Sequence, residues 1–336
     1  MIRIKAQALE DLVRDIFVRA GCSEAEGKRI GKYLVIANLT GHDSHGVQRV
    51  PRYLQWKADG AFIADREVKV VSETPVIAVL DGQYGFGQTI TPQAVAIGIR
   101  KCKEMGLSCV ALRDVGHIGR VGDWAEMTER RFSTAPYCVG VPRPGQMPVI
   151  LDFATSVVAE GKVLNASFGG KALPEDALIG PDGKVSNDPH VLYGNYTPTG
   201  LRNHSQGTGA IRAFGDHKGS GLALMCELLG GSLTGTGATE PGRKFSNGML
   251  SFYVDPAKLD TSGFFPKDVQ RYIDFVKGAK PATPGGEVLI PGEPEERTKA
   301  ERLANGVPLP EDTWGAIVEA ARKVGVDERR IQLAAQ

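Results

Sequence analysis

Apolar residues recur at helical spacing near both ends of the chain. Residues 6–20 carry them three or four positions apart, at Leu9, Leu12, Val13, Ile16 and Phe17. Gly21 ends this pattern, and the capping-box residues Ser23 and Glu26 open a second predicted helix that ends at Gly41. A third, short helix is expected near Val47. The same spacing predicts helices over residues 266–278, 311–324 and 327–334.

The middle of the chain alternates between short apolar runs and helical patterns. The apolar runs predict strands over residues 68–71, 76–81, 108–113, 149–153 and 248–254. Helices are predicted over residues 91–105, 157–168 and 218–233, and another from residue 122. Residues 173–215 are polar with little periodicity, and a segment of that length favours a functional loop. Alternation of this kind is typical of an α/β protein.

These patterns predict two domains. The helical segments at the two ends, residues 1–66 and 262–336, are expected to pack together as a helical domain. Residues 67–261 are expected to form a central sheet domain that binds a ligand.

Composition and charge narrow the class of protein. The chain has 336 residues, and its 40 Lys and Arg side chains nearly balance 39 Asp and Glu, for a net charge of +1. Nucleic-acid and membrane-surface partners usually require a basic excess, so neither is expected. The five cysteines form no Cys-x-x-Cys pair, which favours reduced thiols and a cytoplasmic location. Neither a signal peptide nor a membrane-spanning run is expected.

Residues 37–53 concentrate side chains that can do chemistry. His42 and His45 have the spacing His-x-x-His and could bind a metal, which would require a third ligand. The polar side chains could instead cap the end of the preceding helix. A third interpretation assigns proton transfer to His45, its orientation to Ser44, and carboxylate binding to the planar guanidinium of Arg49.

Two further segments place polar residues after predicted strands. His117 and Gly119 follow a strand directly, where α/β proteins bind ligands. A histidine there can also lie at the edge of the core, hydrogen-bonded to a carbonyl. Thr155 and Ser156 follow the next strand at the expected start of a helix. Their hydroxyl groups and the free N–H groups can bind a phosphate or simply cap that helix.

Glycine-rich and charged turns provide weaker signals. Lys218 opens a helix after a glycine and forms a plausible phosphate cradle. Neither a Walker loop nor Gly-x-Gly-x-x-Gly occurs, so an ordinary Rossmann site has no support. Asp188 lies in an Asn-Asp-Pro turn and could partner a histidine. Residues 291–297 are predicted to form a turn whose charges reach a ribose or a phosphate.

Taken in order, these motifs resemble the malate/L-lactate dehydrogenase family, which does not use the Rossmann fold and includes ureidoglycolate dehydrogenase, sulfolactate dehydrogenase and piperideine-2-carboxylate reductase. The matching residues lie in the segments 37–53, 116–119, 152–162, 188–189, 217–224 and 291–293. The resemblance implies an NAD- or NADP-dependent oxidoreductase that acts on a small 2-oxo or 2-hydroxy acid, or on a related imino acid. It also implies a homodimer and a non-Rossmann, NAD(P)-binding mixed sheet flanked by a helical domain.

The resemblance also implies roles for individual residues. Ser44, His45, Arg49 and His117 would surround the substrate, and Asp188 would support the proton relay. The implied cofactor contacts are His117, Gly119, Asp152, Thr155, Ser156, Lys162, His217, Lys218, Gly219, Gly292, Glu293 and Arg297.

The predicted mechanism is hydride transfer to the 2-carbon of a bound 2-oxo acid, with an imidazolium as the proton donor. His117 is the first choice for that donor and His45 the second, and Arg49 binds the carboxylate. Two alternatives remain open. One is a metal-dependent hydrolase that uses His42, His45 and His117; the other is a catalytically impaired dinucleotide-binding homologue.

The second alternative follows from a departure between Met127 and Arg131. The family pattern has roughly two dozen further residues there, enough for a strand at ~3.3 Å per residue and a connecting loop. Family members place a strand and a glycine-rich segment of the cofactor pocket in this stretch. A true loss would impair cofactor binding and turnover.

Overall fold

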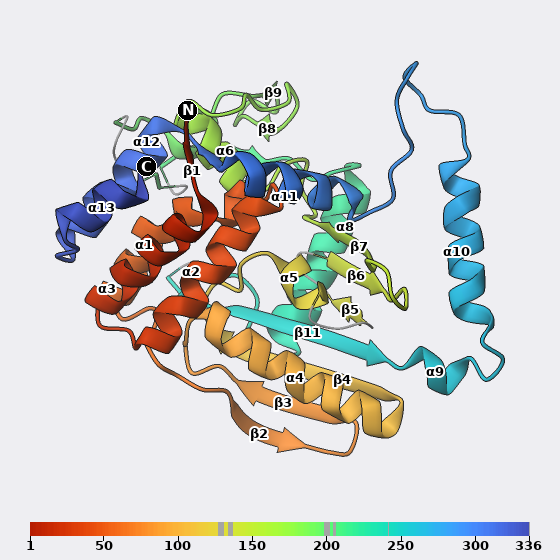
Figure 1. The fold of residues 1–336 in the computed structure, drawn as a ribbon. Helices are drawn as coiled ribbons and strands as arrows, with labels where there is room; N and C mark the ends of the chain where they lie inside the picture. The colour runs from red at the N-terminus through yellow and green to blue at the C-terminus, as the bar shows by residue number, and fades with distance from the viewer. Residues whose placement is uncertain (127–130, 134–136, 198–201, 204–205, 241, 336) are drawn as a thin grey trace.

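The computed structural model describes residues 1–336 except 127–130, 134–136, 198–201, 204–205, 241 and 336. Figure 1 shows a group of helices from both chain ends on one side of a central mixed sheet, with helix α10 on the opposite side of the molecule. The α/β class is therefore confirmed.

The helical group is built from amphipathic helices of both chain ends. Apolar faces of α1 and α2 pack together with residues from 307–334 in one hydrophobic cluster. Strand β1 pairs antiparallel with β12 and so ties the two ends of the chain. The bounds are β1 Ile2–Ile4, α1 Ala6–Arg19, α2 Glu24–Leu39, η1 Asp43–His45, η2 Val47–Arg49, α3 Val50–Ala58, β12 Val307–Leu309, α12 Glu311–Lys323 and α13 Glu328–Ala334.

The predicted capping box at α2 forms only in part. Ser23 Oγ accepts a hydrogen bond from the Glu26 backbone N–H at 3.2 Å. The Glu26 carboxylate, however, accepts from the backbone N–H of Asp65 at 2.7 Å and from Thr89 Oγ1 at 2.9 Å. The Ser23 N–H donates to Asp65 instead. Glu26 therefore links α2 to helix α4 of the sheet region, and burial raises the pKa of this carboxyl.

The central sheet has seven strands in the order β2-β3-β4-β11-β5-β6-β7. Only β3 and β4 pair in parallel, joined by helix α4, whose apolar face covers them; the other described pairs are antiparallel. This mixed order matches the expected non-Rossmann sheet. The bounds are β2 Lys69–Glu73, β3 Ile77–Asp81, α4 Gly87–Met105, β4 Leu107–Val115, α5 Val121–Glu126, β5 Arg131–Ser133, β6 Tyr137–Val141, β7 Val149–Phe153 and β11 Asn247–Val254.

Pairing at the centre of this sheet is uneven. Strand β11 pairs with β4 at seven positions but pairs with β5 only at Ser251 and Phe252. Strand β5 begins directly after residues 127–130, which lie outside the described part of the chain. The predicted departure from the family pattern therefore falls at this short strand.

A third hydrophobic cluster is built from residues between Val157 and Ile211, and α8 follows this region in the chain. The stretch 173–215, predicted as a loop without periodicity, contains a small antiparallel sheet and a helical turn, a difference that arises because two-residue strands carry no readable period. The bounds are α6 Glu160–Ser167, β8 Leu178–Ile179, β9 Val185–Ser186, α7 His190–Tyr193, β10 Ala210–Ile211, α8 His217–Cys226 and the π-helix η3 Glu227–Ser232.

The remaining helices are α9 Pro256–Leu259, α10 Phe264–Lys277 and α11 Glu293–Asn305. The prediction of a turn over 291–297 is wrong beyond Gly292, because α11 begins at Glu293. Pro294 in its first turn and three acidic residues there favour a helix start. Within the described residues, no helix has the length and apolar character needed to cross a bilayer.

Candidate active site

Three of the segments that carry predicted site residues, 37–53, 152–162 and 217–224, line one cavity of about 550 Å³. It lies where the turn after α2 faces the segment between β7 and α6, with helix α8 on a further side. Its lining includes His42, Ser44, His45, Arg120, Asp152, Thr155, Ser156, Glu160, Lys162, Ala223, Cys226 and Glu227.

His45 and His117 lie against each other at this site. Their ring planes are inclined by 10° with centroids 5.6 Å apart. Ser44 Oγ lies 2.9 Å from His45 Nδ1, and the Tyr53 hydroxyl lies 2.7 Å from His117 Nδ1. Gln88 Nε2 donates to the Tyr53 hydroxyl at 3.0 Å. His45 lines the cavity, whereas His117 is anchored from the aromatic cluster behind it.

Both imidazoles are held in the neutral form. Burial, with smaller contributions from the nearby Arg49 and His42, lowers the pKa of His45 to about 3. Burial and then Arg49 lower the pKa of His117 well below its ordinary value. A neutral imidazole can accept a proton, and an anion bound beside it would raise its pKa toward the range for donation.

Arg49 is fixed by two acceptors. Its Nε donates to the Ser44 backbone carbonyl and its Nη2 to Glu160 Oε2, each at 2.8 Å. The other carboxylate oxygen of Glu160 accepts from the buried Tyr193 hydroxyl. Arg49, predicted to bind substrate, does not line this cavity; it lines a separate, smaller pocket that shares Glu160 with the cavity.

A second ion pair, which is buried, lies beside the cavity at Arg120. Arg120 Nη1 donates to Asp123 Oδ1 at 2.8 Å, and both side chains are only 3% exposed. The Asp152 carboxylate accepts from the Gly122 N–H at 2.7 Å, and burial raises its pKa. Asp152 therefore links the end of β7 to the start of α5 by a hydrogen bond.

The predicted phosphate site at Thr155 and Ser156 differs in detail from the expectation. Helix α6 begins at Glu160, so these hydroxyl residues precede it, and Ser156 Oγ donates to the Val158 carbonyl at 2.8 Å. The first residue of the helix is an acid, which opposes anion binding at that N-terminus. Both residues nevertheless line the cavity with Lys162.

The start of α8 lies beside this segment, as the sequence predicts. Gly219 packs so closely that a Cβ there would lie 2.3 Å from the Phe214 carbonyl and 2.7 Å from the Thr155 carbonyl. His217 and Lys218 are exposed at this helix start. The structure thus brings the segments at 155 and 218 together.

Other predicted residues lie away from the cavity lining. Asp188 is exposed and hydrogen-bonds His190, with Oδ1 2.8 Å from Nδ1. Glu293 pairs with Lys277, and Arg297 pairs with Glu287. Gly292 has φ +101° and packs on the start of β7. Gly119 has φ +73° and contacts the Gln88 side chain.

Helix α11 reaches the site through residues that sequence reasoning did not select. Glu295 Oε1 lies 3.5 Å from His42 Nε2. Arg302 binds the Asp43 carboxylate with both terminal nitrogens, at 2.6 and 3.0 Å. His42 is thus drawn toward α11 while His45 stacks on His117. Across the described residues, no group of three His, Cys, Asp or Glu is arranged to hold a metal.

Sequence reasoning also missed Glu160, Tyr193 and Gln88. Glu160 stands two residues before Lys162, but a single acidic residue at a helix start is ordinary, so no local signal distinguished it. Arg120 directly follows Gly119, and this position was its only signal.

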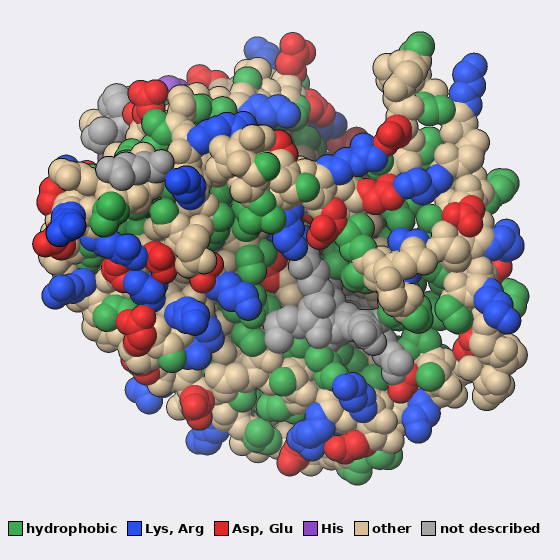
Figure 2. All heavy atoms as spheres, in the orientation of Figure 1, with side chains coloured by type: hydrophobic (Ala, Val, Ile, Leu, Met, Phe, Trp, Pro, Cys, Tyr) green, Lys and Arg blue, Asp and Glu red, His purple; other side chains and the backbone are tan. Residues whose placement is uncertain are grey.

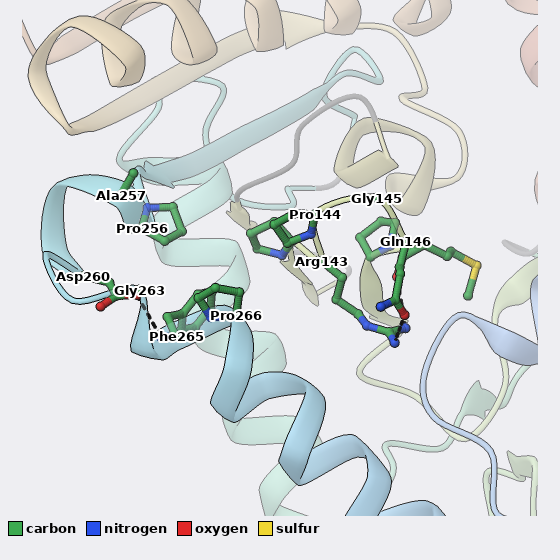
Figure 3. Close-up of a pocket in the computed structure, with 13 residues that line it drawn as sticks. Arg143, Pro144, Gly145, Gln146, Pro256, Ala257, Asp260, Gly263, Phe265 and Pro266 are labelled. Atoms are coloured by element: carbon green, nitrogen blue, oxygen red, sulfur yellow. Dashed lines mark hydrogen bonds between the residues drawn. The ribbon is translucent and has the colours of Figure 1, made fainter.

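A larger cavity, of about 850 Å³, lies elsewhere, between the β6–β7 connection and the α9–α10 segment (Figure 3). Prolines and Phe265 dominate its walls, and the Arg143 guanidinium is held by Gln146 and Gln270. Its lining contains none of the residues predicted to carry chemistry, so the smaller cavity is the candidate active site.

Comparison with known proteins agrees with this assignment. The malate/L-lactate dehydrogenase family pattern matches residues 4–130 and 128–318. Hydroxycarboxylate dehydrogenase B of Escherichia coli O157:H7 is 33% identical over 362 residues, covering 98% of this chain and 96% of that protein. L-sulfolactate dehydrogenase of Methanocaldococcus jannaschii is 29% identical, over 96% of this chain and 98% of that protein.

Solved structures give the same result. A putative malate/lactate dehydrogenase from E. coli superposes with a TM-score of 0.89 at 32% identity, covering 100% of this chain and 99% of the other. The sequence, the mixed sheet and the cavity therefore place this chain in the malate/L-lactate dehydrogenase family. It is a dehydrogenase that acts on the CH–OH group of a hydroxy acid, in a family that generally uses nicotinamide cofactors. These relatives give the metal-hydrolase alternative no support.

Proposed function

We propose that this chain transfers a hydride between NAD(P)H and the 2-carbon of a small 2-oxo or 2-hydroxy acid, or a related imino acid. The observation that carries the proposal is the convergence of His45 and Lys162 on one cavity, beside the guanidinium of Arg49. The relatives are named for hydroxycarboxylate and sulfolactate, which share an anionic group next to the reacting carbon.

We infer that the same cavity binds a nicotinamide dinucleotide. Thr155, Ser156 and Lys162 offer hydroxyl groups and a cation for phosphate or ribose, and Gly219 lets the α8 backbone approach closely. A bound reduced nicotinamide supplies the hydride, and the protein supplies placement and electrostatics.

Within this proposal, His45 rather than His117 exchanges the proton with the substrate oxygen. The reason is position, because His45 lines the cavity and its Nδ1 is already engaged by Ser44. His117 would support the His45 ring by stacking, held in turn by Tyr53. This order reverses the ranking made from sequence.

Arg49 would bind the substrate carboxylate through guanidinium N–H groups other than those held by Ser44 and Glu160. Asp188 lies just before α7 and takes no part in the proposed proton relay.

The direct test is a panel of 2-oxo and 2-hydroxy acids followed by the absorbance of reduced nicotinamide, with NADH and NADPH in parallel. We expect turnover of at least one short 2-oxo acid with one of the two cofactors. Tight nucleotide binding without turnover would instead favour the impaired-homologue alternative. That alternative is motivated by the two-residue pairing of β5 with β11 and by an alignment, at 362 residues, longer than this chain.

We further propose a homodimer, on the basis of two uncovered apolar surfaces. Helix α10 exposes 64% of Phe264 and 72% of Phe275, and Figure 2 shows apolar side chains around that helix. The α8–η3 segment exposes Leu224, Leu228 and Leu233. Light scattering after size exclusion is expected to give twice the chain mass, and Leu228→Asp to shift it toward the monomer. If Leu228→Asp remains a dimer, the α8–η3 surface is excluded as the dimer interface.

A further inference from the structure

The carboxylate of Glu160 stands in a cavity proposed to bind an anion. It is the first residue of α6, and its side chain is 34% exposed, against 12% for Arg49. A negative charge beside the proposed carboxylate site weakens substrate binding by repulsion. Its presence there therefore needs a chemical reason other than substrate affinity.

The contacts of Glu160 point to that reason. One oxygen holds Arg49 Nη2, and the other accepts from the Tyr193 hydroxyl. Arg49 Nε in turn holds the Ser44 carbonyl, and Ser44 Oγ contacts the His45 ring. A chain of polar contacts thus runs from Tyr193 to His45, across two parts of the fold that are separated by 111 positions at the Arg49–Glu160 pair.

Close packing between α6 and the Ser44 turn holds these polar contacts in place. Gly161 lies against the Ser44 turn so tightly that a Cβ would be 2.4 Å from Ser44 Cβ. Gln48 Nε2 also donates to the Gly161 carbonyl at 3.3 Å. The first turn of α6 is therefore a rigid platform for the catalytic turn, and it carries Glu160 at its edge.

The charges around His45 complete the argument. The groups that act on its imidazole are Arg49, His42, Glu160 and Arg120, with neutral His117 stacked on the ring. Arg49, His42 and Arg120 oppose protonation of His45, and the carboxylate of Glu160 favours it. Glu160 itself contacts Arg49 and Tyr193 through its two carboxylate oxygens.

We propose that Glu160 is a positioning residue that holds the Arg49 guanidinium and offsets its charge, so that His45 can carry the proton that the substrate oxygen receives. The inference rests on the proposed function. Glu160 thereby weakens the binding of the substrate carboxylate and favours proton donation by His45.

Glu160→Gln keeps the size of the side chain and removes its charge. In this variant we expect KM for a 2-oxo acid to fall, because Arg49 is no longer neutralised. We expect kcat for reduction to fall about tenfold at a given pH, which corresponds to a profile displaced by about one pH unit to the acid side. A merely structural role would lower kcat equally at all pH values and would raise KM.

Two further variants separate charge from shape. Glu175→Gln, on an exposed residue outside the cavity lining, is the matched control and is expected to leave both constants unchanged. Glu160→Asp keeps the charge and is expected to keep the wild-type pH profile even if Glu160→Gln does not fold. A shifted profile in Glu160→Asp, or equal behaviour of Glu160→Gln and Glu175→Gln, would overturn the proposal.

A binding measurement without turnover keeps this inference distinct from the proposed function. Oxamate, an unreactive 2-oxo acid isostere, is titrated into the full chain with reduced nucleotide present and followed by tryptophan fluorescence. We expect about fivefold tighter binding by Glu160→Gln than by the wild type. A wild type that neither binds oxamate nor turns over would refute the proposed function, whereas a wild type that does both, with an unchanged variant, would refute only the role of Glu160.

Discussion

Individual side chains at the site are fixed by partners on both sides. Ser44 occupies Nδ1 of His45, and Tyr53 occupies Nδ1 of His117. A hydrogen bond at one ring nitrogen sets which nitrogen remains for a ligand. Nε2 therefore remains in both rings, and the two histidines differ in position, because His45 lines the cavity and His117 does not.

Substituting each histidine in turn tests their order. We expect His45→Gln to lower kcat for reduction by ~10²–10⁴-fold, the usual worth of a positioned proton donor. His117→Gln is expected to cost less, because that ring supports His45 and does not line the cavity. Steady-state kinetics on the best acid of the panel measure both, with nucleotide affinity as the control. A larger loss in His117→Gln would restore the order inferred from sequence.

The secondary-structure elements position the site through close backbone contacts. The turn after α2 is clamped between α6, through Gly161, and α11, through the pairing of Arg302 with Asp43. Helix α11 is strongly charged and was predicted only as a turn, because an apolar periodicity is what reveals a helix in sequence. Its contribution here is to hold the polar turn rather than to fill the core.

Gly161→Ala tests this clamp. The new Cβ would lie 2.4 Å from Ser44 Cβ, so α6 and the turn must separate. We expect a loss of about 1–3 kcal/mol in the free energy of unfolding, together with a higher KM. The control is Gly315→Ala in α12, where no atom lies within 4 Å of the added Cβ, and it is expected to stabilise the protein by ~0.5–1 kcal/mol. Urea unfolding measures the free energy of unfolding of both variants. Equal values would show that α6 and the turn can separate at little cost.

On the scale of the whole molecule, the described residues form three hydrophobic clusters, two of which reach the cavity through Val121 and Val158. The cluster of the helical group takes its C-terminal members from residues 307–334, and α10 stands on the far side of the sheet (Figure 1). The bounds proposed from sequence, 1–66 with 262–336 and 67–261, thus assign α10 to the helical domain although it lies apart from that group. Limited proteolysis can locate the boundary.

The buried imidazoles also make stability depend on pH. Burial lowers the pKa of His45 to about 3 and that of His117 well below its ordinary value. In the unfolded chain each binds a proton below pH ~6.5. The unfolded state then holds more protons, so the free energy of unfolding falls as pH drops from ~6.5 toward 3, by at most about 1.4 kcal/mol per pH unit for each ring.

Urea unfolding at pH 7 and pH 5 checks this expectation for the wild type and for His117→Gln. The variant is expected to lose less stability between the two pH values. Glu26 and Asp152, whose carboxyl pKa values are raised by burial, contribute equally to both proteins and cancel in the comparison. An identical loss in the two proteins would show that the ring is protonated without cost.

Much of this protein was determined by the sequence alone. Apolar spacing located α1, α2, α12 and α13, and the ordered motifs identified the family, because periodicity and turn residues act within a few positions. The tertiary structure decided which imidazole faces the cavity, and that Glu160 meets Arg49 from 111 positions away. Burial, charge and close contact between distant segments have no local pattern, so only the folded arrangement could assign them.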